Sequence, residues 1–544
     1  MPTIKREVVA SEAVVSSNHP LASAAGLQML ARGGNAVDAA IATAFALTVV
    51  EPMMVSIFGA GMMVIRDGAT GEVTNVDNYA KAPAAARPDM FTPADGPDPM
   101  ATVGRENEVG YRAVGVPGAL PAWAAILKER GRLPLKTVIA PAIAYAVDGY
   151  AVSQYLHSCI SLAAADLSRF PASAAVFLPN GAVPAVGDRI VRTDYARTLE
   201  RIGAEGAGAF TAGVIAEAVV ADMAKNGGLI TKEDLSSYRF ARREPVRGTY
   251  RGYEIVSAAP TSSGGTHIVQ VLNILEGFDL RPGAASLHLV AEALKIAFAD
   301  RFKYMGDPDF VDVPVAWLTD KGYAAQRRSQ IDPRRASAFR AGERTRESAD
   351  TTHLTVMDKD GNVVAMTQTL HAVFGSKVTV PGTGMLLNNT MWLFDPHPGR
   401  ANSIAPGKRM LSSMSPTIVL KDGKPLMALG TPGGTRIFAA VLQAIIHVID
   451  HGMSLQEAVE APRIWTDGGD LELEEGVPSS VRAQLAGMGH RIRVVPRVAG
   501  GMNGVLRDPE SGLLHGAACW RADGTPMGMS GGFTSIARDA GVPL

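Results

Sequence analysis

A hairpin signal between residues 351 and 370 constrains the fold of this chain more tightly than any other segment. The turn is Asp358-Lys359-Asp360-Gly361-Asn362, and apolar runs lie on both sides of it, at 354–357 and 363–370. Asp358 suits the first position of a type I turn and Gly361 the left-handed residue that follows, which predicts a three-residue loop with a bulge. This loop pairs Asp358 with Asn362, and the same register places Thr369 opposite Thr351. Directly opposed side chains have Cβ atoms roughly 4.5–5.5 Å apart, so we expect two hydroxyl groups to meet.

Thr351 is a candidate nucleophile. Within the chain its nitrogen is an amide and accepts no proton, but a cut between Asp350 and Thr351 would turn it into an α-amino group beside the hydroxyl. That arrangement is the N-terminal threonine form of nucleophilic catalysis. The alternative is an ordinary strand residue, because threonine is enriched in strands and the tripeptide Thr351-Thr352-His353 carries little information by itself.

The composition indicates an ordered globular protein. Of the 544 residues 47% are hydrophobic and 19% charged, and a formal net charge of -1 gives no basic field for nucleic acid. The two cysteines, Cys159 and Cys519, are interpreted as small buried hydrophobes rather than a redox pair. The most apolar run, 39–50, is too short to span a bilayer, and no apolar segment typical of a secretory signal follows the first residues. We therefore expect a soluble cytoplasmic protein with no membrane or nucleic-acid partner.

Helices are expected in the N-terminal part and a polar linker before Thr351. Apolar spacing predicts a helix over 23–32 that ends at Gly33, a plausible left-handed cap, and a second, alanine-lined helix over 36–47. Thr231 is expected to cap a third helix, with Asp234 three residues on. The arginine-rich segment 333–350 is interpreted as a solvated linker rather than a binding patch. A chain can be cut in such a segment without losing core contacts.

Short motifs in a fixed order over nearly the whole chain resemble the gamma-glutamyltranspeptidase family of N-terminal nucleophile hydrolases. Each motif alone is weak, but their order and spacing together are specific. They are Ser17-Asn18-His19-Pro20-Leu21-Ala22-Ser23, Gly33-Gly34-Asn35-Ala36-Val37-Asp38-Ala39-Ala40, Val116-Pro117-Gly118, Pro260-Thr261-Ser262-Ser263-Gly264-Gly265, Ala299-Asp300-Arg301, Gly306-Asp307-Pro308, Thr351-Thr352-His353, Leu386-Leu387-Asn388-Asn389, Leu411-Ser412-Ser413-Met414-Ser415-Pro416 and Gly430-Thr431-Pro432-Gly433-Gly434.

This resemblance implies a fold and a chemistry. The fold class is α+β, a four-layer αββα sandwich of the N-terminal nucleophile hydrolase type. Self-cleavage between Asp350 and Thr351 gives a large chain, 1–350, and a small chain, 351–544, which stay associated as one interlocked domain. Thr351 then attacks an amide carbonyl of a small-molecule substrate and forms an acyl-enzyme, while Thr369 hydrogen-bonds the nucleophile and assists self-cleavage. No cofactor is implied, and whether two such units pair into a dimer is left open.

The resemblance also assigns the oxyanion hole to the backbone N–H groups of Gly433 and Gly434. Glycine backbone can approach a ligand closely because no side chain intervenes. Donors that are fixed before reaction stabilise the developing alkoxide, and losing one typically costs about 3 kcal/mol in the barrier. Without the family context, Gly433-Gly434 would be interpreted as a plain tight turn.

Several positions depart from the family pattern in the set that holds a glutamyl group. Tyr79 stands where the family has an arginine for the substrate carboxylate, and His371 stands where it has an asparagine. Thr390 and Leu393 replace a polar residue and an aspartate for the substrate amino group. A buried ammonium without partners is costly, and removing one partner of a charged hydrogen bond costs about 1.5–3 kcal/mol. We therefore expect γ-glutamyl compounds to be poor substrates.

Ser412 and Ser413 are retained, and the family hydroxyls at these positions contact the substrate carboxylate. A carboxylate-bearing amide without an α-amino group fits what remains, with Tyr79, His371 and Thr390 as further contacts. We therefore expect a self-cleaving hydrolase of a small acidic amide, similar in character to oxamate amidohydrolase. The alternatives are a γ-glutamyltransferase or glutathione hydrolase, a cephalosporin-type acylase, and an unmatured binding protein on the same fold.

No metal is expected, because the eleven histidines show no HExxH or paired Cys/His spacing. Strand alternation places His353 on the same face as Thr351 and opposite to Thr352. We interpret His353 as structural support, since the freed α-amino group already supplies a base. Arg112 is a further candidate cation, but a surface arginine is the preferred interpretation.

Overall fold

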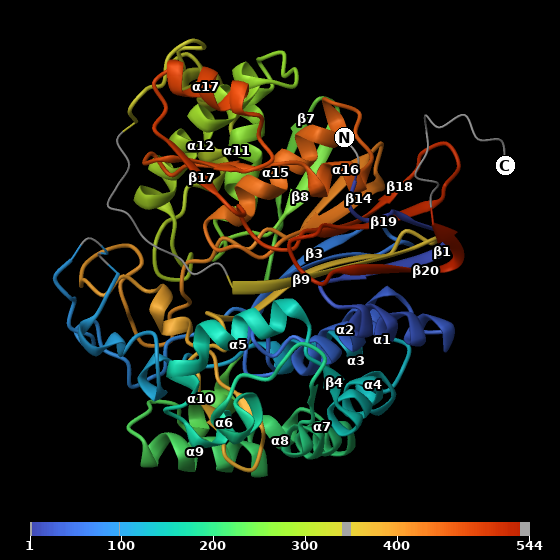
Figure 1. Ribbon diagram of the computed structural model, residues 1–544, viewed down its shortest axis with the longest axis vertical. Helices are drawn as coiled ribbons and strands as arrows, with labels where there is room; N and C mark the ends of the chain where they lie inside the picture. The colour runs from blue at the N-terminus through green and yellow to red at the C-terminus, as the bar shows by residue number, and fades with distance from the viewer. Residues whose placement is uncertain (1–2, 97, 99, 340–349, 534–544) are drawn as a thin grey trace.

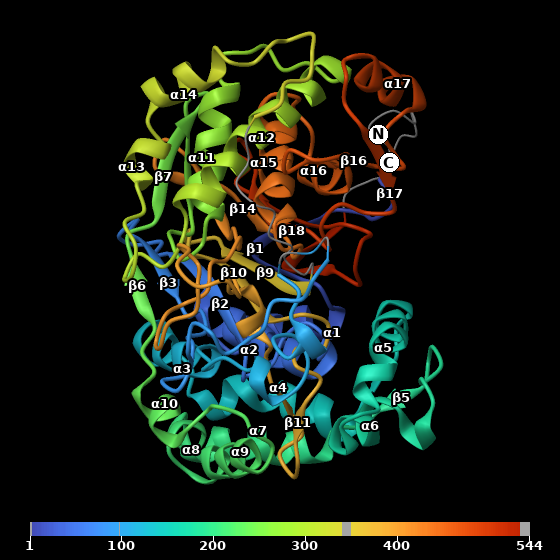
Figure 2. The same cartoon turned by 90° about the vertical axis from the view of Figure 1, so that its left-hand side faces the viewer.

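The computed structural model describes residues 3–96, 98, 100–339 and 350–533. Strands form the middle of the molecule and helices cover both outer faces (Figures 1 and 2). The strands are β1 Val8–Ser17, β2 Ala60–Arg66, β3 Val73–Asp77, β4 Tyr150–Ala151, β5 Arg189–Ile190, β6 Ala241–Arg243, β7 Val246–Tyr250, β8 Tyr253–Ser257, β9 Asp350–Asp358, β10 Val363–His371, β11 Thr379–Val380, β12 Met385–Leu386, β13 Thr417–Lys421, β14 Lys424–Gly430, β15 Ile464–Trp465, β16 Leu471–Glu474, β17 Ile492–Val495, β18 Asn503–Arg507, β19 Leu514–Ala518 and β20 Thr525–Phe533.

The helices gather before β6 in the sequence and again around the strands that follow it. They are α1 Pro20–Ala31, α2 Ala36–Val50, α3 Ala119–Arg130, α4 Leu135–Asp148, α5 Gln154–Leu167, α6 Pro171–Phe177, α7 Thr193–Glu205, α8 Gly208–Thr211, α9 Val214–Lys225, α10 Lys232–Ser237, α11 Gly264–Leu275, α12 Ala284–Tyr304, α13 Val315–Leu318, α14 Lys321–Arg328, α15 Arg436–Ile449, α16 Leu455–Glu460 and α17 Ser479–Gly487. Short 3-10 turns are η1 Val103–Arg105, η2 Tyr111–Ala113, η3 Pro179–Gly181 and η4 Thr390–Leu393.

The main strands join in one 13-stranded hydrogen-bonded network that folds back into two layers. Its order is β6-β3-β2-β10-β9-β1-β19-β18-β14-β13-β8-β7, and β20 pairs with β1. The first residues of β1 pair with β19 and its last residues with β9, so β1 passes from one layer to the other. β9 and β10 follow residue 350 yet lie between β2 and β1, which precede it. Segments 1–350 and 351–544 are therefore interleaved within the same sheets.

Three apolar cores show the four layers. Alternate strand residues face opposite sides: Leu354 and Val356 of β9 pack toward the α1–α9 side, while Met357 faces the core between the two sheet layers. On the second layer, Met427 and Leu429 of β14 pack toward α11, α12 and α15, and the intervening Ala428 joins the central core. The order helix, sheet, sheet, helix confirms the α+β class and the αββα sandwich (Figure 1).

The predicted hairpin forms with its expected loop. Asp358 N donates to Asn362 O at 3.1 Å, Gly361 N donates to Asp358 O at 3.1 Å, and Gly361 is left-handed with φ 84°. Pairs from Val363–Met357 to Gln368–Thr352 follow the predicted register. Beyond Gln368 the register shifts, so that His371 rather than Thr369 pairs with a β9 residue, Asp350. The predicted direct pairing of Thr351 with Thr369 is therefore wrong, because a β-bulge shifts the register near the end of the hairpin.

The predicted helices form with longer bounds than expected. α1 begins at Pro20, where a fixed φ suits the first helical position, and Gly33 follows it at φ 84°. α2 begins at Ala36, where Asn35 and Asp38 form a capping box, and runs three residues past the predicted end. The expected Thr231–Asp234 capping box is confirmed at α10.

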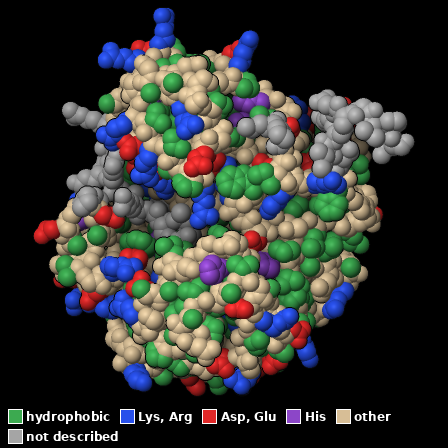
Figure 3. Space-filling model, viewed as in Figure 1, with side chains coloured by type: hydrophobic (Ala, Val, Ile, Leu, Met, Phe, Trp, Pro, Cys, Tyr) green, Lys and Arg blue, Asp and Glu red, His purple; other side chains and the backbone are tan. Residues whose placement is uncertain are grey.

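The linker and the surface fit the sequence interpretation where they are described. Arg334 and Arg335 are exposed, whereas Arg340, Arg344 and Arg346 lie outside the described residues. Cys159 and Cys519 are both buried and unbridged, as predicted. On the face in Figure 3, Lys/Arg and Asp/Glu side chains are interspersed without a patch of one sign.

Within the described ranges no single helix is both long enough and apolar enough to cross a membrane. One pair of helices, Thr193–Glu205 with Gly208–Lys225, reaches that length and apolarity only when joined across a 116° bend. The expected cytoplasmic location stays a prediction.

Candidate active site

Thr351 lies near the start of β9 with its hydroxyl against that of Thr369. Thr351 Oγ1 donates to Thr369 Oγ1 at 3.4 Å, and the Thr369 oxygen also accepts the His371 N–H at 2.7 Å. Both threonines are buried. The bulge in β10 therefore preserves the predicted meeting of hydroxyls although it breaks the strict backbone pairing. The peptide between Asp350 and Thr351 lies at the beginning of the strand.

The next two residues of β9, Thr352 and His353, form hydrogen bonds on opposite faces of the strand. Thr352 Oγ1 donates to Glu51 Oε2 at 2.5 Å, on the α2 side. His353 faces the other sheet layer, where its ring nitrogens lie 2.8 Å from Thr367 Oγ1 and 2.9 Å from Thr355 Oγ1. Burial lowers the pKa of His353 to about 3. A neutral imidazole held between two hydroxyls fits the structural role predicted for it.

Glu51 is a buried acid behind the nucleophile strand that sequence reasoning missed. Burial raises the pKa of the Glu51 carboxyl to about 8, against the opposing effect of the Thr352 hydrogen bond, with Asp523 raising it further. Its second oxygen, Oε1, has no hydrogen-bond partner among the described residues. An acid at the end of the apolar run 39–50 is the only sequence signal of this site.

Gly433 and Gly434 form a turn directly before α15. Their carbonyl oxygens accept from Arg436 N and Ile437 N, both at 3.1 Å, and so begin the hydrogen-bond ladder of α15. Neither glycine N–H donates to another described residue. The φ angles are 147° and 56°, which side chains rarely allow. Backbone N–H groups at a helix N-terminus can bind an anion, and the role of this pair as the oxyanion hole stays a prediction.

Strand directions bring this turn toward Thr351. Arg66 ties the hairpin loop to the start of β14, because its Nη1 donates to Gly361 O at 2.7 Å and its Nη2 to Gly423 O at 3.1 Å. At the other end, Gly430 packs so closely on His353 that an added Cβ would lie 2.4 Å from the ring. β14 therefore runs antiparallel to β9 across the two layers. The residues after Gly430 continue toward the end of β9 that carries Thr351.

Ser412 and Ser413 lie against the loop before α11 and against a buried arginine. Ser263 Oγ donates to Ser412 O at 2.9 Å. Arg301 Nε donates to Ser263 Oγ and its Nη2 to Ser413 Oγ, both at 3.0 Å. Arg301 is 1% exposed. Ala299-Asp300-Arg301 is one of the motifs that resemble the family, but no sequence pattern connects Arg301 with the serine pair.

Tyr79 and Leu393 are two of the positions at which the chain departs from the family pattern. Both are buried and belong to the same apolar cluster as Met391 and Met410. The Tyr79 backbone is fixed at both ends, because its N–H donates to Asp77 Oδ1 at 3.0 Å and its carbonyl accepts from Tyr238 Oη at 2.9 Å. Leu393 offers no acceptor to a substrate ammonium. The roles of these residues in substrate binding stay predictions.

His371 and Thr390 have limited hydrogen-bonding capacity. Burial, with Lys377 nearby, lowers the pKa of His371 to about 3, so it is neutral at pH 7. Its φ of 85° is unusual for a residue with a side chain, and its ring packs edge-on against Trp392. The Thr390 hydroxyl donates to Asn388 Oδ1 at 2.8 Å, so toward a substrate it can only accept. Neither residue supplies the positive charge that the family arginine would.

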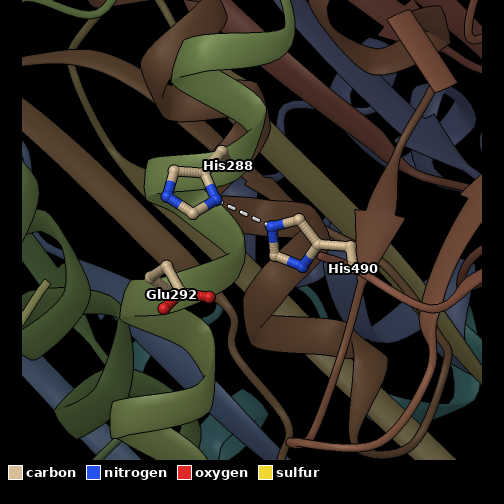
Figure 4. A group of neighbouring side chains, drawn as sticks. All are labelled: His288, Glu292 and His490. Atoms are coloured by element: carbon tan, nitrogen blue, oxygen red, sulfur yellow. Dashed lines mark hydrogen bonds between the residues drawn. The ribbon is translucent and has the colours of Figure 1, made fainter. Parts of the chain in front are cut away.

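Two further candidates can be placed. Arg112 pairs with Glu106 at 2.7 Å and is partly exposed, as predicted for a surface arginine. His288, Glu292 and His490 form a buried group that the sequence spacing did not reveal (Figure 4). His288 bonds both His490 and Asp332 O at 2.8 Å, and the Glu292 oxygens accept from Lys295 Nζ and Ser337 N. Other protein groups thus hydrogen-bond the nitrogen and oxygen atoms with which these three residues could hold a metal ion. The expectation of no metal stays a prediction.

Comparison with known proteins places this site in a family. The family model of gamma-glutamyltranspeptidase matches residues 22–529. The chain is 53% identical to the acylase ACY 1 proenzyme of Pseudomonas sp. (strain V22), over 97% of this chain and 96% of that protein. It is 38% identical to the glutathione hydrolase proenzyme of Bacillus subtilis (strain 168), over 97% and 93%. The structure of cephalosporin acylase from Bacillus halodurans superposes with a TM-score of 0.89 at 32% identity, covering 97% of this chain and 98% of that one. The chain therefore belongs to the gamma-glutamyltranspeptidase family, and it is an N-terminal nucleophile enzyme that hydrolyses or transfers acyl groups.

Proposed function

We propose that this protein is a self-cleaving acylase whose acyl group carries a terminal carboxylate and no α-amino group. The observation that carries the proposal is a combination: Ser413 lies beside a buried arginine, while a buried leucine, Leu393, stands where the family pattern has an aspartate for the substrate amino group. The site retains a carboxylate subsite and lacks its amino subsite. An ammonium buried there would lose hydration without compensation.

The acyl chain length follows from the retained serine pair. Removing the α-amino group from a γ-glutamyl group leaves the 4-carboxybutanoyl group, whose carboxylate keeps the same separation from the reacting carbonyl. In oxamate the carboxylate is bonded directly to that carbonyl, so it would lie beside Thr351 rather than reach the serines. The 53% identity with an acylase supports the longer acyl group over an oxamate-like substrate. Oxamate remains the second candidate because it also lacks an α-amino group.

Catalysis proceeds from the freed terminus of Thr351. Its α-amino group takes the Oγ1 proton as the oxygen attacks the substrate carbonyl, and the Gly433 and Gly434 N–H groups receive the resulting oxyanion. Collapse expels the amine, which takes the proton, and leaves an ester on Thr351. Water then attacks the ester while the α-amino group accepts its proton, this proton passes to Thr351 Oγ1 as the C–O bond breaks, and the free acid leaves. The proenzyme names of the relatives support cleavage of this precursor before Thr351.

Maturation and selectivity test the proposal together. Purified protein should give two bands on a denaturing gel, with a new N-terminus at Thr351, and Thr351→Ala should stay uncut. Mature protein should hydrolyse 4-carboxybutanoyl anilide with a kcat/KM at least tenfold higher than that for γ-glutamyl anilide. Oxamate and glutathione are assayed alongside as the alternative substrates. Equal or faster turnover of the γ-glutamyl compound would contradict the substrate class. A folded, long-incubated wild type that remains uncut would contradict the mechanism.

A further inference from the structure

Glu51 lies at the end of α2 and reaches the residue that follows the nucleophile. Thr352 Oγ1 donates to Glu51 Oε2 at 2.5 Å, and both side chains are buried. α2 packs against β9 and β10, the two strands that carry Thr351 and Thr369. This hydrogen bond therefore joins segment 1–350 to the strand with which segment 351–544 begins.

A chain of hydrogen bonds with one direction ends at the Glu51 carboxyl. Asn503 Nδ2 donates to His353 O at 2.8 Å and to Asn18 Oδ1 at 3.2 Å. A carbonyl oxygen only accepts, so the bond to His353 O fixes which end of the Asn503 amide faces Asn18. Asn18 Nδ2 then donates to Thr352 Oγ1 at 3.4 Å, and the Thr352 hydroxyl donates to Glu51. The chain holds the two residues directly after the nucleophile.

The backbone after Glu51 holds the second threonine strand. Glu51 O accepts from Met54 N at 3.0 Å, and Met54 O accepts from Leu370 N at 2.8 Å. Leu370 directly follows Thr369 in β10. The end of α2 thus contacts β9 through the Glu51 side chain and β10 through the turn that follows.

Cleavage before Thr351 removes a support on one side of the nucleophile. In the uncut chain Thr351 lies between two backbone pairs, Asp350 with His371 and Thr352 with Gln368. After cleavage Asp350 ends the large chain, and the backbone of Thr351 continues only into Thr352. Contacts at Thr352 then determine where the nucleophile and its α-amino group lie.

A second buried acid of α2 has a different set of partners. The oxygens of Asp38 accept at 2.8–3.0 Å from the backbone N–H groups of Asn35, Arg132 and Leu133. Asp38 therefore caps its helix and holds a neighbouring loop. Glu51 Oε2 instead accepts from a hydroxyl on the nucleophile strand, and its Oε1 has no hydrogen-bond partner among the described residues. A buried acid with so few partners costs stability, and such departures are expected at functional sites.

We propose that Glu51 is a positioning residue for the mature nucleophile: through Thr352 it holds the new N-terminus at Thr351 against Thr369. The inference rests on the proposed function, because it requires cleavage before Thr351. A misplacement of about 1 Å can cost about 10²-fold in rate. Loss of this anchor should therefore lower kcat while substrate binding stays intact.

The test compares turnover with self-cleavage. Glu51→Leu and Thr352→Val each remove one side of the hydrogen bond with little change in side-chain volume. On mature enzyme, each should lower kcat for 4-carboxybutanoyl anilide about tenfold or more and change KM less than threefold. The half-time of self-cleavage, followed on denaturing gels, should change less than threefold, because Asp350 still holds Thr351 in the precursor.

Conservative variants should rescue the rate. Glu51→Gln and Thr352→Ser keep a donor and an acceptor in place, so kcat should stay within threefold of wild type. Burial raises the pKa of the Glu51 carboxyl to about 8, so a neutral glutamine is a close mimic of it at pH 7. Thr43→Val is the matched control: Thr43 is a buried α2 residue whose hydroxyl donates within the helix, to Ala39 O at 2.8 Å. Both kcat and the cleavage half-time should be unchanged in this control.

The double variant Glu51→Leu with Thr352→Val covers a single variant that does not fold. Replacing both partners leaves no polar group unpaired, so its stability should be close to that of wild type. Its kcat should be as low as in the single variants and not lower, because both residues act through one contact.

The outcomes separate this inference from the proposed function. A kcat within threefold of wild type in the folded, cleaved variants, or an equal slowing of turnover and self-cleavage, overturns the role of Glu51. A wild type that stays uncut overturns the proposed function instead. The comparison applies to whichever anilide the wild type hydrolyses, so an error in the proposed acyl group would leave it valid.

Discussion

Gly433→Ala tests whether the turn before α15 is the oxyanion hole. Gly433 has φ 147°, and a Cβ added there would lie 2.6 Å from Ala499 Cβ and 2.8 Å from Ala499 Cα. Carbon atoms in contact normally stay about 3.5–4.0 Å apart. The backbone must therefore move by about 1 Å, and the left-handed conformation adds strain.

The displacement predicts a catalytic loss much larger than the loss of stability. A misplacement of about 1 Å can cost about 10²-fold in rate, and removing one oxyanion donor costs about 10²- to 10³-fold in kcat. Backbone strain of this kind costs about 1–3 kcal/mol of folding free energy. We expect kcat of matured Gly433→Ala to fall by about 10²- to 10³-fold while the protein remains folded at 25 °C.

Single-turnover kinetics on 4-carboxybutanoyl anilide, with circular dichroism melting, measure the two effects. Gly452→Ala is the matched control: Gly452 has φ 63°, yet nothing lies within 4 Å of its added Cβ, so it should lose stability but keep kcat. Ala499→Gly in the Gly433→Ala background removes the closest contact and should restore part of the rate. A kcat within threefold of wild type in folded, matured Gly433→Ala would refute the oxyanion assignment.

Three other substitutions probe the surroundings of the nucleophile. Thr369→Val removes the hydroxyl 3.4 Å from Thr351 Oγ1, so maturation and kcat should fall about tenfold or more, whereas Thr369→Ser should keep both in gel and kinetic assays. Leu393→Asp should raise the kcat/KM ratio of γ-glutamyl to 4-carboxybutanoyl anilide about tenfold or more by giving the ammonium an acceptor; an unchanged ratio would contradict this reading of Leu393. Glu51 has an ordinary pKa of 4.5, and burial raises it to about 8 in the folded protein. As pH rises above about 4.5, the unfolded chain loses this proton first. The contribution of Glu51 to the free energy of unfolding therefore declines up to pH 8, by at most about 1.4 kcal/mol per pH unit. Urea unfolding of the uncut Thr351→Ala precursor at pH 5.5 and 7.5 should show this decline, and adding Glu51→Gln should remove it; parallel pH profiles would argue against the raised pKa.

Local features of the fold could be predicted because they depend on neighbours in the sequence. The Asp358–Gly361 loop, the cap at Gly33 and the Thr231–Asp234 capping box all form as expected. The register of the hairpin held until the bulge beyond Gln368. There the β10 backbone turns through the left-handed His371, a conformation that its side chain gave no reason to expect.

The candidate site could be predicted only where motifs carry it. Thr351 and Thr369 are 18 residues apart, and hairpin geometry alone brought their hydroxyls together. Glu51 contacts Thr352, and Arg301 contacts Ser413, across more than a hundred residues of chain, and no local pattern connects either residue with its partner. Their partners are set by how α2 and α12 pack on opposite faces of the sandwich, which no spacing rule reports.

The arrangement separates the residues proposed for chemistry from those proposed for selectivity, and this separation can be tested. Thr351 and Thr369 lie on adjacent strands of one layer, whereas Tyr79 and Leu393 lie outside the strands, beyond β3 and in η4. Self-cleavage acts on the peptide before Thr351 and needs no bound acyl group. Tyr79→Arg and Leu393→Asp should therefore change KM values tenfold or more while the half-time of self-cleavage, followed on denaturing gels after rapid purification, stays within about twofold of wild type. A half-time lengthened as much as in Thr369→Val would mean that the selectivity residues also hold the cleavage site, and that this family cannot change its substrate without affecting its own maturation.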